Sequence, residues 1–141
     1  VQKAFGDQPA FDPANFKRIN QRVEAGYIRI DADEVSYPAH VILRYEIERA
    51  LIEGDIDVQH IPALWDEKMR AYLGLSTKDN FRDGCMQDIH WTDGAFGYFP
   101  TYTLGAIYAA QLFASAKVAL PDLNSQILRG DLSPLSDWLR Q

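Results

Sequence analysis

Helical segments that begin near a proline and end at a glycine are the feature that most constrains this chain. Apolar residues recur at helical spacing over residues 33–53 and again from Pro62, and these two segments end at Gly54 and Gly74. Proline is favoured in the first turn of a helix, and glycine accepts the left-handed backbone that closes one. We therefore expect an all-α, mainly helical chain.

Further helices are expected at both ends. Asp12, followed by a proline, has the character of an N-cap, and the pattern after it predicts a helix over residues 13–24. Aromatic and small residues recur at helical spacing over residues 98–118, and two short helices finish the chain. Residues 27–31 are aromatic and β-branched, so they could form one short extended segment.

Apolar stripes on the two central helices are predicted to form the core. In residues 33–53 the stripe consists of Val35, Ile42, Tyr45, Ile47, Ala50 and Leu51. In the helix from Pro62 it consists of Leu64, Trp65, Met69, Tyr72 and Leu73. With 141 residues, 47% of them hydrophobic, the chain can bury one modest core.

Charge and cysteine content exclude several classes of protein. The formal net charge is -6 and the basic residues are scattered, which disfavours partners such as nucleic acids or anionic membranes. The longest apolar run is too short to span a bilayer. Cys85 is the only cysteine, so no internal disulfide can form, and a reducing, cytoplasmic compartment fits best.

The three histidines do not form a metal-binding motif. His40, His60 and His90 are far apart in sequence, and no H-E-x-x-H helix is present. We expect His40 at the edge of the core and His60 at a helix cap. His90 follows Asp88 by two residues, so an extended backbone could point both side chains the same way, and the carboxylate could fix the imidazole tautomer. A histidine with a purely structural role in a loop fits this spacing better than a catalytic one.

Arg29 and the aromatic residues near position 100 are equally open to two interpretations. Arg29 could bind a carboxylate with its planar guanidinium, although a salt bridge with Asp31 or Asp33 is the simpler expectation. Tyr98 and Tyr102 fit an aromatic packing stripe as well as a binding surface.

Two longer motifs resemble signatures of one enzyme family. Residues 28–33 match the pattern I-R-x-x-A-D, and residues 84–91 match G-x-x-Q-D-x-H-W at every fixed position. Residues 45–54 and 96–105 are also similar to that family. The chain thus resembles the Taq-type thermostable metallocarboxypeptidases over nearly its whole length.

This resemblance implies a large helical fold, similar to neurolysin and angiotensin-converting enzyme, of which residues 1–141 are a single C-terminal segment of the catalytic domain. The implied enzyme is a cytoplasmic homodimer that uses zinc or cobalt to release C-terminal residues from peptides. Its H-E-x-x-H motif and downstream glutamate are expected upstream of this chain, so we assign no metal ligand here and expect the segment alone to bind no metal and to be inactive.

The resemblance also implies roles for individual residues. Arg29 would bind the carboxylate of the substrate, and His90 and Tyr102 would face the reacting carbonyl, with Tyr98 as the competing tyrosine. Gln87 and Asp88 would support the substrate-binding residues. A non-catalytic helical interaction module and a catalytically inactive relative are the alternatives.

Overall fold

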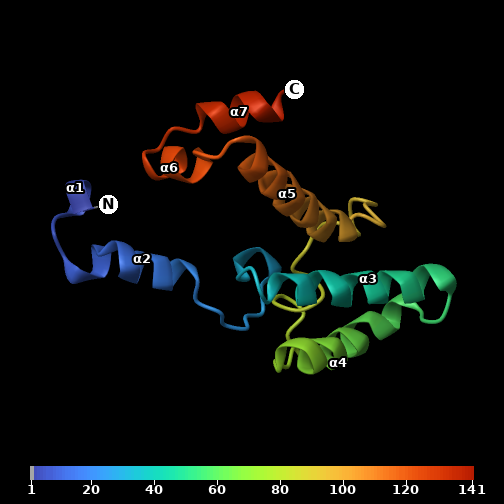
Figure 1. Ribbon diagram of the computed structural model, residues 1–141. Coiled ribbons are helices and arrows are strands. Elements are labelled where there is room, and N and C mark those ends of the chain that lie inside the picture. Colours follow the sequence, from blue (N-terminus) through green and yellow to red (C-terminus); the bar gives the residue numbers. More distant parts are fainter. Residues whose placement is uncertain (1) are drawn as a thin grey trace. The chain divides into compact units, whose positions relative to one another are not determined.

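The computed structural model describes residues 2–141, and its regular elements are helices, with no strand in this range. In chain order they are α1 (Gln2–Phe5), η1 (Pro9–Phe11), α2 (Pro13–Asn20), η2 (Arg29–Asp31), α3 (Tyr37–Glu53), η3 (Val58–His60), α4 (Ile61–Leu73), α5 (Pro100–Ala119), α6 (Leu123–Leu128) and α7 (Ser133–Leu139), where η marks 3-10 helices (Figure 1). The expected all-α class is confirmed. The chain divides into two compact units, Val1–Pro100 and Thr101–Gln141.

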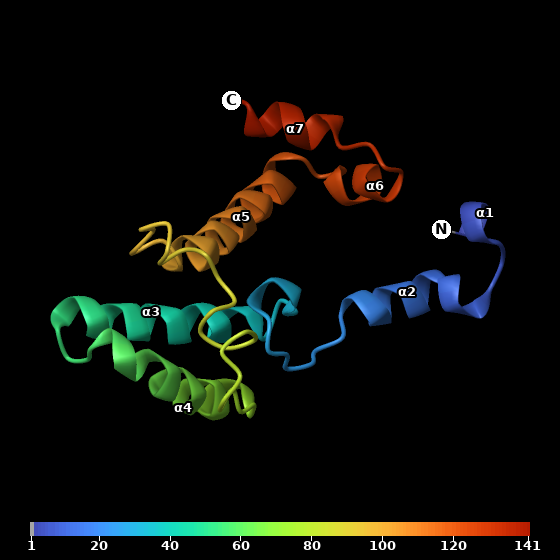
Figure 2. The same cartoon turned by 180° about the vertical axis from the view of Figure 1, so that it is seen from behind.

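Helices α3 and α4 form a hairpin that organises the first unit. They pack against each other in both views (Figures 1 and 2). Gly54 after α3 has φ 79° and Gly74 after α4 has φ 71°. A side chain would strain this left-handed backbone, so the two predicted glycine caps are confirmed.

The core of the first unit lies between these helices. Its fully or almost fully buried members are Leu43, Ile47, Trp65 and Met69. Leu51, Leu64 and Leu73 pack against this cluster. The predicted core face of α4 is therefore confirmed except at Tyr72, which is 43% exposed.

The predicted apolar stripe of α3 is partly wrong. Three of its members are exposed instead: Val35, Ile42 and Tyr45. The buried face includes polar side chains at four-residue spacing: His40, Arg44 and Glu48. Hydrophobic periodicity could not reveal this face, because charged residues are normally assigned to solvent.

Several predicted boundaries are also corrected. Helix α2 ends at Asn20 and not near residue 24, although Asp12 caps it as predicted by accepting from the Ala14 N–H at 2.8 Å. Helix α3 begins at Tyr37, because Asp33 accepts from the backbone N–H groups of Val35 and Ser36 and turns the chain ahead of the helix.

The expected extended segment at residues 27–31 is wrong for its second half. Ile28 has extended backbone angles, but Arg29–Asp31 form the 3-10 helix η2. This turn directs Arg29 inward, where it is only 6% exposed.

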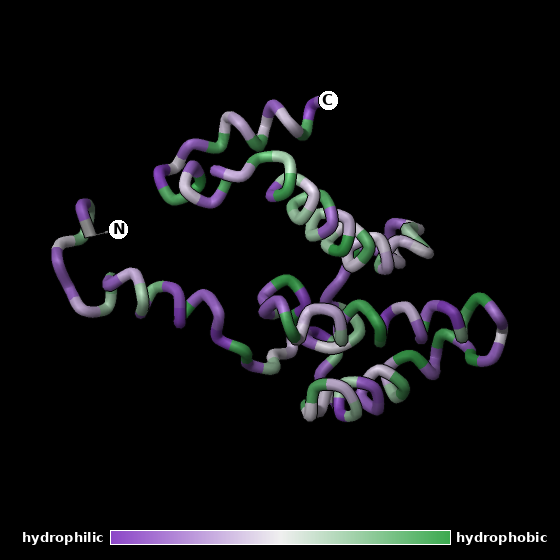
Figure 3. The backbone as a smooth tube through the Cα atoms, viewed as in Figure 1, coloured by the Kyte–Doolittle hydropathy of each residue, from purple (hydrophilic) through white to green (hydrophobic). Residues whose placement is uncertain are grey.

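Helix α5 dominates the second unit and is apolar on all sides. Figure 3 shows only short hydrophilic stretches along it. Its exposed apolar side chains include Leu104, Ile107, Tyr108, Leu112 and Val118. Ala116 of α5 and Leu123 of α6 are fully buried. No described helix has both the length and the apolar character of a membrane span.

Candidate functional site

The two sequence signatures meet in the first unit. The backbone N–H of Arg29 donates to Gln87 Oε1 at 2.8 Å, and the Arg29 guanidinium donates to Asp88 Oδ1 through Nε at 3.1 Å and Nη2 at 2.8 Å. Arg29 Nη1 also donates to the Tyr37 hydroxyl at 2.8 Å. Arg29 thus pairs with Asp88, fifty-nine residues away in the sequence.

Gln87 ties its loop to two other backbone segments. Its Nε2 donates to the carbonyl oxygens of Tyr27 at 2.9 Å and Asp83 at 2.7 Å, while its Oε1 accepts from Arg29. One amide side chain therefore joins the segment before η2 to the loop after α4.

Asp88 lies between two arginines. Arg44 Nε donates to Asp88 Oδ2 at 2.6 Å, on the side opposite the Oδ1 contact with Arg29. The side chains of Arg29, Arg44 and Asp88 are 7%, 0% and 11% exposed. Burial acts to raise the pKa of Asp88, but the hydrogen bonds and charges of both arginines outweigh it and hold the pKa below its usual range.

Arg44 is fully enclosed by the protein. Its Nη1 donates to the His40 carbonyl oxygen at 2.8 Å, and its guanidinium lies 4.5 Å from the Trp65 ring centroid and 5.6 Å from that of Phe99. Burial lowers the pKa of Arg44 to about 10, so the side chain remains charged at neutral pH.

Glu48 holds the far side of the same loop. Its carboxylate accepts from Trp91 Nε1 at 2.8 Å and from the backbone N–H of Gly97. The loop between them is also closed by its own backbone, because the Ala95 N–H donates to the His90 carbonyl oxygen at 2.8 Å.

His90 lies within an aromatic group in this loop. Its ring centroid is 4.3 Å from that of Phe99 and 5.7 Å from that of Tyr98, and its side chain is 13% exposed. Asp88 Oδ1 lies 3.9 Å from His90 Nδ1, which is longer than a hydrogen bond. Asp88 is therefore close to His90, as expected, but its hydrogen bonds go to the arginines.

Five of the six candidate site residues fall in the first unit: Arg29, Gln87, Asp88, His90 and Tyr98. Tyr102 lies in the first turn of α5, in the second unit. Their proposed contacts with substrate stay predictions.

The other two histidines have structural positions. His60 Nδ1 accepts from the Asp57 N–H at 3.0 Å in a reciprocal cap of η3, which confirms the capping role. His40 is fully buried, deeper than the predicted core edge. Burial, aided by the charge of Arg44, lowers the pKa of His40 to about 4, so the ring is neutral at physiological pH.

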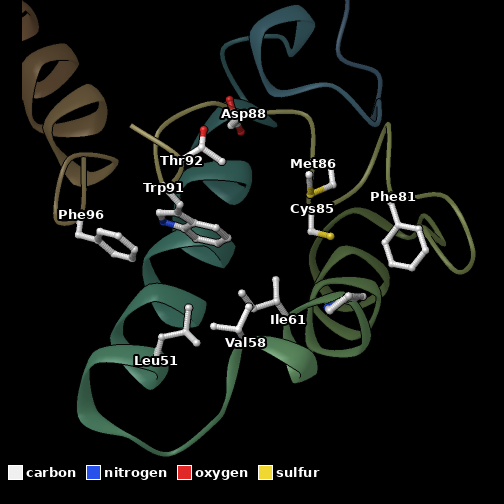
Figure 4. Close-up of a pocket in the computed structure, with 11 residues that line it drawn as sticks. Leu51, Val58, Ile61, Phe81, Cys85, Met86, Asp88, Trp91, Thr92 and Phe96 are labelled. Atoms are coloured by element: carbon white, nitrogen blue, oxygen red, sulfur yellow. The ribbon is translucent and has the colours of Figure 1, made fainter. Parts of the chain in front are cut away.

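An apolar cavity of about 580 Å³ lies beside this site (Figure 4). Its lining includes Leu51, Val58, Ile61, Phe81, Met86 and Trp91. The Cys85 thiol also lines it, and burial raises the pKa of that thiol, which keeps it protonated and unsuited to act as a nucleophile.

Metal ligands do not gather among the described residues. No three His, Cys, Asp or Glu side chains from residues 2–141 lie close enough together to hold an ion. The site residues described here therefore do not fit a metal centre, and no metal-binding role is assigned to them.

Arg44 and Glu48 are the site residues that sequence reasoning missed. Neither belongs to the two signatures, and a charged residue on a helix is ordinarily solvated. Their four-residue spacing on the same face as the core residues Leu43 and Ile47 was the available signal.

Comparisons with known proteins agree with this geometry. The sequence model of the family described as Carboxypeptidase Taq (M32) metallopeptidase matches residues 1–141. Thermostable carboxypeptidase 1 of Thermus thermophilus is 48% identical over 118 residues, which are 84% of this chain and 23% of that protein. The chain thus spans about a quarter of the length of the curated relatives it matches.

Solved structures show the same relationship. Trypanosoma cruzi metallocarboxypeptidase 1 superposes with a TM-score of 0.90 at 53% identity, covering 95% of this chain and 28% of that one. The M32 carboxypeptidase of Deinococcus radiodurans gives a TM-score of 0.91 at 36% identity, covering 99% and 28%. The chain therefore belongs to the Carboxypeptidase Taq (M32) metallopeptidase family.

Proposed function

We propose that this chain is part of a metal-dependent carboxypeptidase that releases residues from the free C-terminal end of peptides. The observation that carries the proposal is the family match over all of residues 1–141, together with relatives that are named carboxypeptidases. Residues of this chain contact the substrate. The metal, zinc or cobalt, is bound by a part of the enzyme outside residues 1–141.

His90 and a tyrosine hydroxyl are proposed to stabilise the oxyanion that forms at the scissile carbonyl. Donors fixed in position before the reaction are effective there, because they need no reorganisation as charge develops. His90 is held in a closed loop and keeps 13% of its side chain exposed, which supports this role. Tyr102 and Tyr98 are the two candidate tyrosines.

Arg29 is proposed to bind the terminal carboxylate of the substrate. Its bonds to Asp88 and Tyr37 fix the plane of the guanidinium before a substrate binds, which supports recognition of a carboxylate in one orientation. Gln87 and Asp88 support the substrate site by holding Arg29 from its backbone and its side chain.

The proposal includes a cytoplasmic homodimer. The single thiol, Cys85, supports a reducing compartment. The exposed apolar residues of α5 support packing against further polypeptide, either another part of the same chain or a partner subunit.

Peptide hydrolysis by the intact enzyme tests the proposed tyrosine role. If Tyr102 donates to the oxyanion, Tyr102→Phe lowers kcat and kcat/KM together by about 100-fold or more with KM little changed. Tyr98→Phe, with the same loss of one hydroxyl, is the matched control. Full kcat in Tyr102→Phe with a loss in Tyr98→Phe would move the role to Tyr98.

Substrate pairs with a free or amidated C-terminus test the Arg29 role. Arg29→Ala should raise KM for the free peptide and have far less effect on the amidated peptide, which is already a poor substrate. Circular dichroism and metal content must match the parent enzyme. An equal loss of kcat/KM on both peptides would show that Arg29 does not bind the carboxylate.

A further inference from the structure

Arg44 holds the segment before His90 through the side chain of Asp88. Asp88, two residues before the histidine, accepts from Arg44 Nε at 2.6 Å. The same guanidinium lies 5.6 Å from the Phe99 ring centroid, and the Phe99 ring lies 4.3 Å from that of His90. Arg44 therefore contacts two neighbours of His90 from inside the protein.

The backbone after His90 is fixed by Glu48. Trp91 follows the histidine directly and donates its indole N–H to Glu48 Oε2 at 2.8 Å. Glu48 Oε1 accepts from the backbone N–H of Gly97, on the other side of the turn. The buried Glu48 carboxylate thus binds both Trp91 and Gly97, on either side of the turn that follows His90.

Both residues project from the same face of α3, because a spacing of four residues is close to one helical turn. We propose that Arg44 and Glu48 are positioning residues that set the location of His90 for peptide hydrolysis. This inference rests on the proposed function, since it assumes that His90 faces the reacting carbonyl.

Stability alone does not explain two buried charged residues on a core helix. Apolar side chains of similar volume often stabilise a fold as well as a buried ion pair does, because the charges lose their hydration. Directed hydrogen bonds at fixed distances, in contrast, determine where a loop lies. The fully buried Arg44 donates to Asp88 and the 3% exposed Glu48 accepts from Trp91, so each side chain forms a hydrogen bond with the loop that carries His90.

Steady-state kinetics of the intact enzyme test this inference. Glu48→Gln keeps the size of the side chain but has only one acceptor for two N–H donors, so kcat should fall by about 10- to 100-fold with KM little changed. Arg44→Met should behave similarly. Arg44→Lys retains the charge facing Asp88 and should recover part of kcat, which a loss of packing alone would not predict.

Glu53→Gln is the matched control, because Glu53 lies on the same helix, is exposed and pairs with the exposed Arg49. It should leave kcat unchanged. If Glu48→Gln does not fold, Trp91→Phe removes the same indole hydrogen bond while retaining a ring, and it should lower kcat in the same way.

His90→Ala, measured in parallel, distinguishes a failure of the positioning role of Arg44 and Glu48 from a failure of the oxyanion role of His90. If it lowers kcat while Arg44→Met, Glu48→Gln and Trp91→Phe do not, the positioning role is overturned and the proposed function stands. If His90→Ala itself leaves kcat unchanged, the oxyanion role of His90 fails, and the positioning role fails with it.

Discussion

Asp88 places one carboxylate between two buried guanidinium groups. Both arginines carry a charge, so the three side chains together hold one excess positive charge away from water. Removing the carboxylate would leave two buried cations uncompensated, which is far more costly than losing an exposed ion pair. We expect the stability of the first unit to depend strongly on this residue.

The Asp88→Asn variant tests this expectation. It preserves shape but removes the charge, and we expect the free energy of unfolding to fall by about 3–5 kcal/mol. Denaturant unfolding measures the loss. Glu53→Gln breaks the exposed Arg49–Glu53 pair and should cost no more than about 1 kcal/mol. Similar losses in both variants would show that Asp88 acts as an ordinary surface carboxylate.

The pH dependence of unfolding should also reveal the contribution of the Asp88 carboxylate. Because the folded pKa of Asp88 lies below its unfolded value of about 3.9, the carboxylate contributes stability that is fully present above the unfolded pKa. That stability is lost as the pH falls through the folded pKa. Asp88→Asn should therefore flatten the pH dependence of unfolding in this acidic range and leave it unchanged near neutrality.

At the scale of elements, Gly84 in the loop after α4 has no room for a side chain. A Cβ at Gly84 would lie 2.6 Å from the Asn80 carbonyl oxygen and 3.2 Å from Thr77 Cβ. The first distance involves backbone and cannot be relieved by turning a side chain. The loop would have to shift, and the residues that follow Gly84 in the same signature would shift with it.

Gly84→Ala should therefore lower stability by about 1–3 kcal/mol, as overpacking does. Gly26→Ala is the matched control: a Cβ there meets nothing within 4 Å, and the change should stay within about 0.5 kcal/mol. Thermal unfolding of the two variants gives the comparison. An unaffected midpoint in Gly84→Ala would mean that the loop adapts without cost.

The sequence predicted the ends of α3 and α4 but missed the start of α3 and the 3-10 turn at Arg29. Gly54 and Gly74 predicted the ends of α3 and α4 because glycine readily adopts the positive φ that closes many helices. The start of α3 was missed because Asp33 turns the chain with side-chain hydrogen bonds that leave no periodic pattern. The 3-10 turn at Arg29 was missed because its geometry depends on Asp88 and Gln87, which are distant in sequence.

Of the site, the two signatures contain Arg29, Gln87 and Asp88, which the structure brings together, but the sequence did not predict how they pair. The expected bond between Asp88 and His90 is replaced by bonds from two arginines, because a buried carboxylate forms its strongest bonds with permanently charged donors. Arg44 was not assigned to the site from sequence, because a charged residue on a helix is ordinarily solvated and its position on the core face is a weak signal.

At the scale of the whole molecule, α5 has the composition of an interior helix. It contains a single charged residue, Lys117, and exposes large apolar side chains such as Leu112 and Val118 in the described chain. Helices that are apolar on all sides are normally surrounded by protein. The chain spans about a quarter of its curated relatives, so we expect other polypeptide to cover α5 in the intact enzyme.

A polypeptide of residues 1–141 produced alone should therefore bind a hydrophobic dye or self-associate. Sedimentation and dye fluorescence measure this, with the intact enzyme as the control. Elemental analysis of the same sample should find no stoichiometric zinc, since no metal-binding group was found in residues 2–141. A compact monomer without dye binding, or one tightly held zinc per chain, would contradict the corresponding expectation.

Because one carboxylate serves two arginines, positions 29, 44 and 88 are linked by epistasis. In a double-mutant cycle, the cost of changing Asp88 should depend on whether Arg44 is still present, with a coupling energy of about 0.5–3 kcal/mol. A substitution that is severe in the parent chain becomes milder once its counter-charge has gone. Directed evolution of this site is therefore expected to succeed with simultaneous changes at the three positions where stepwise libraries fail.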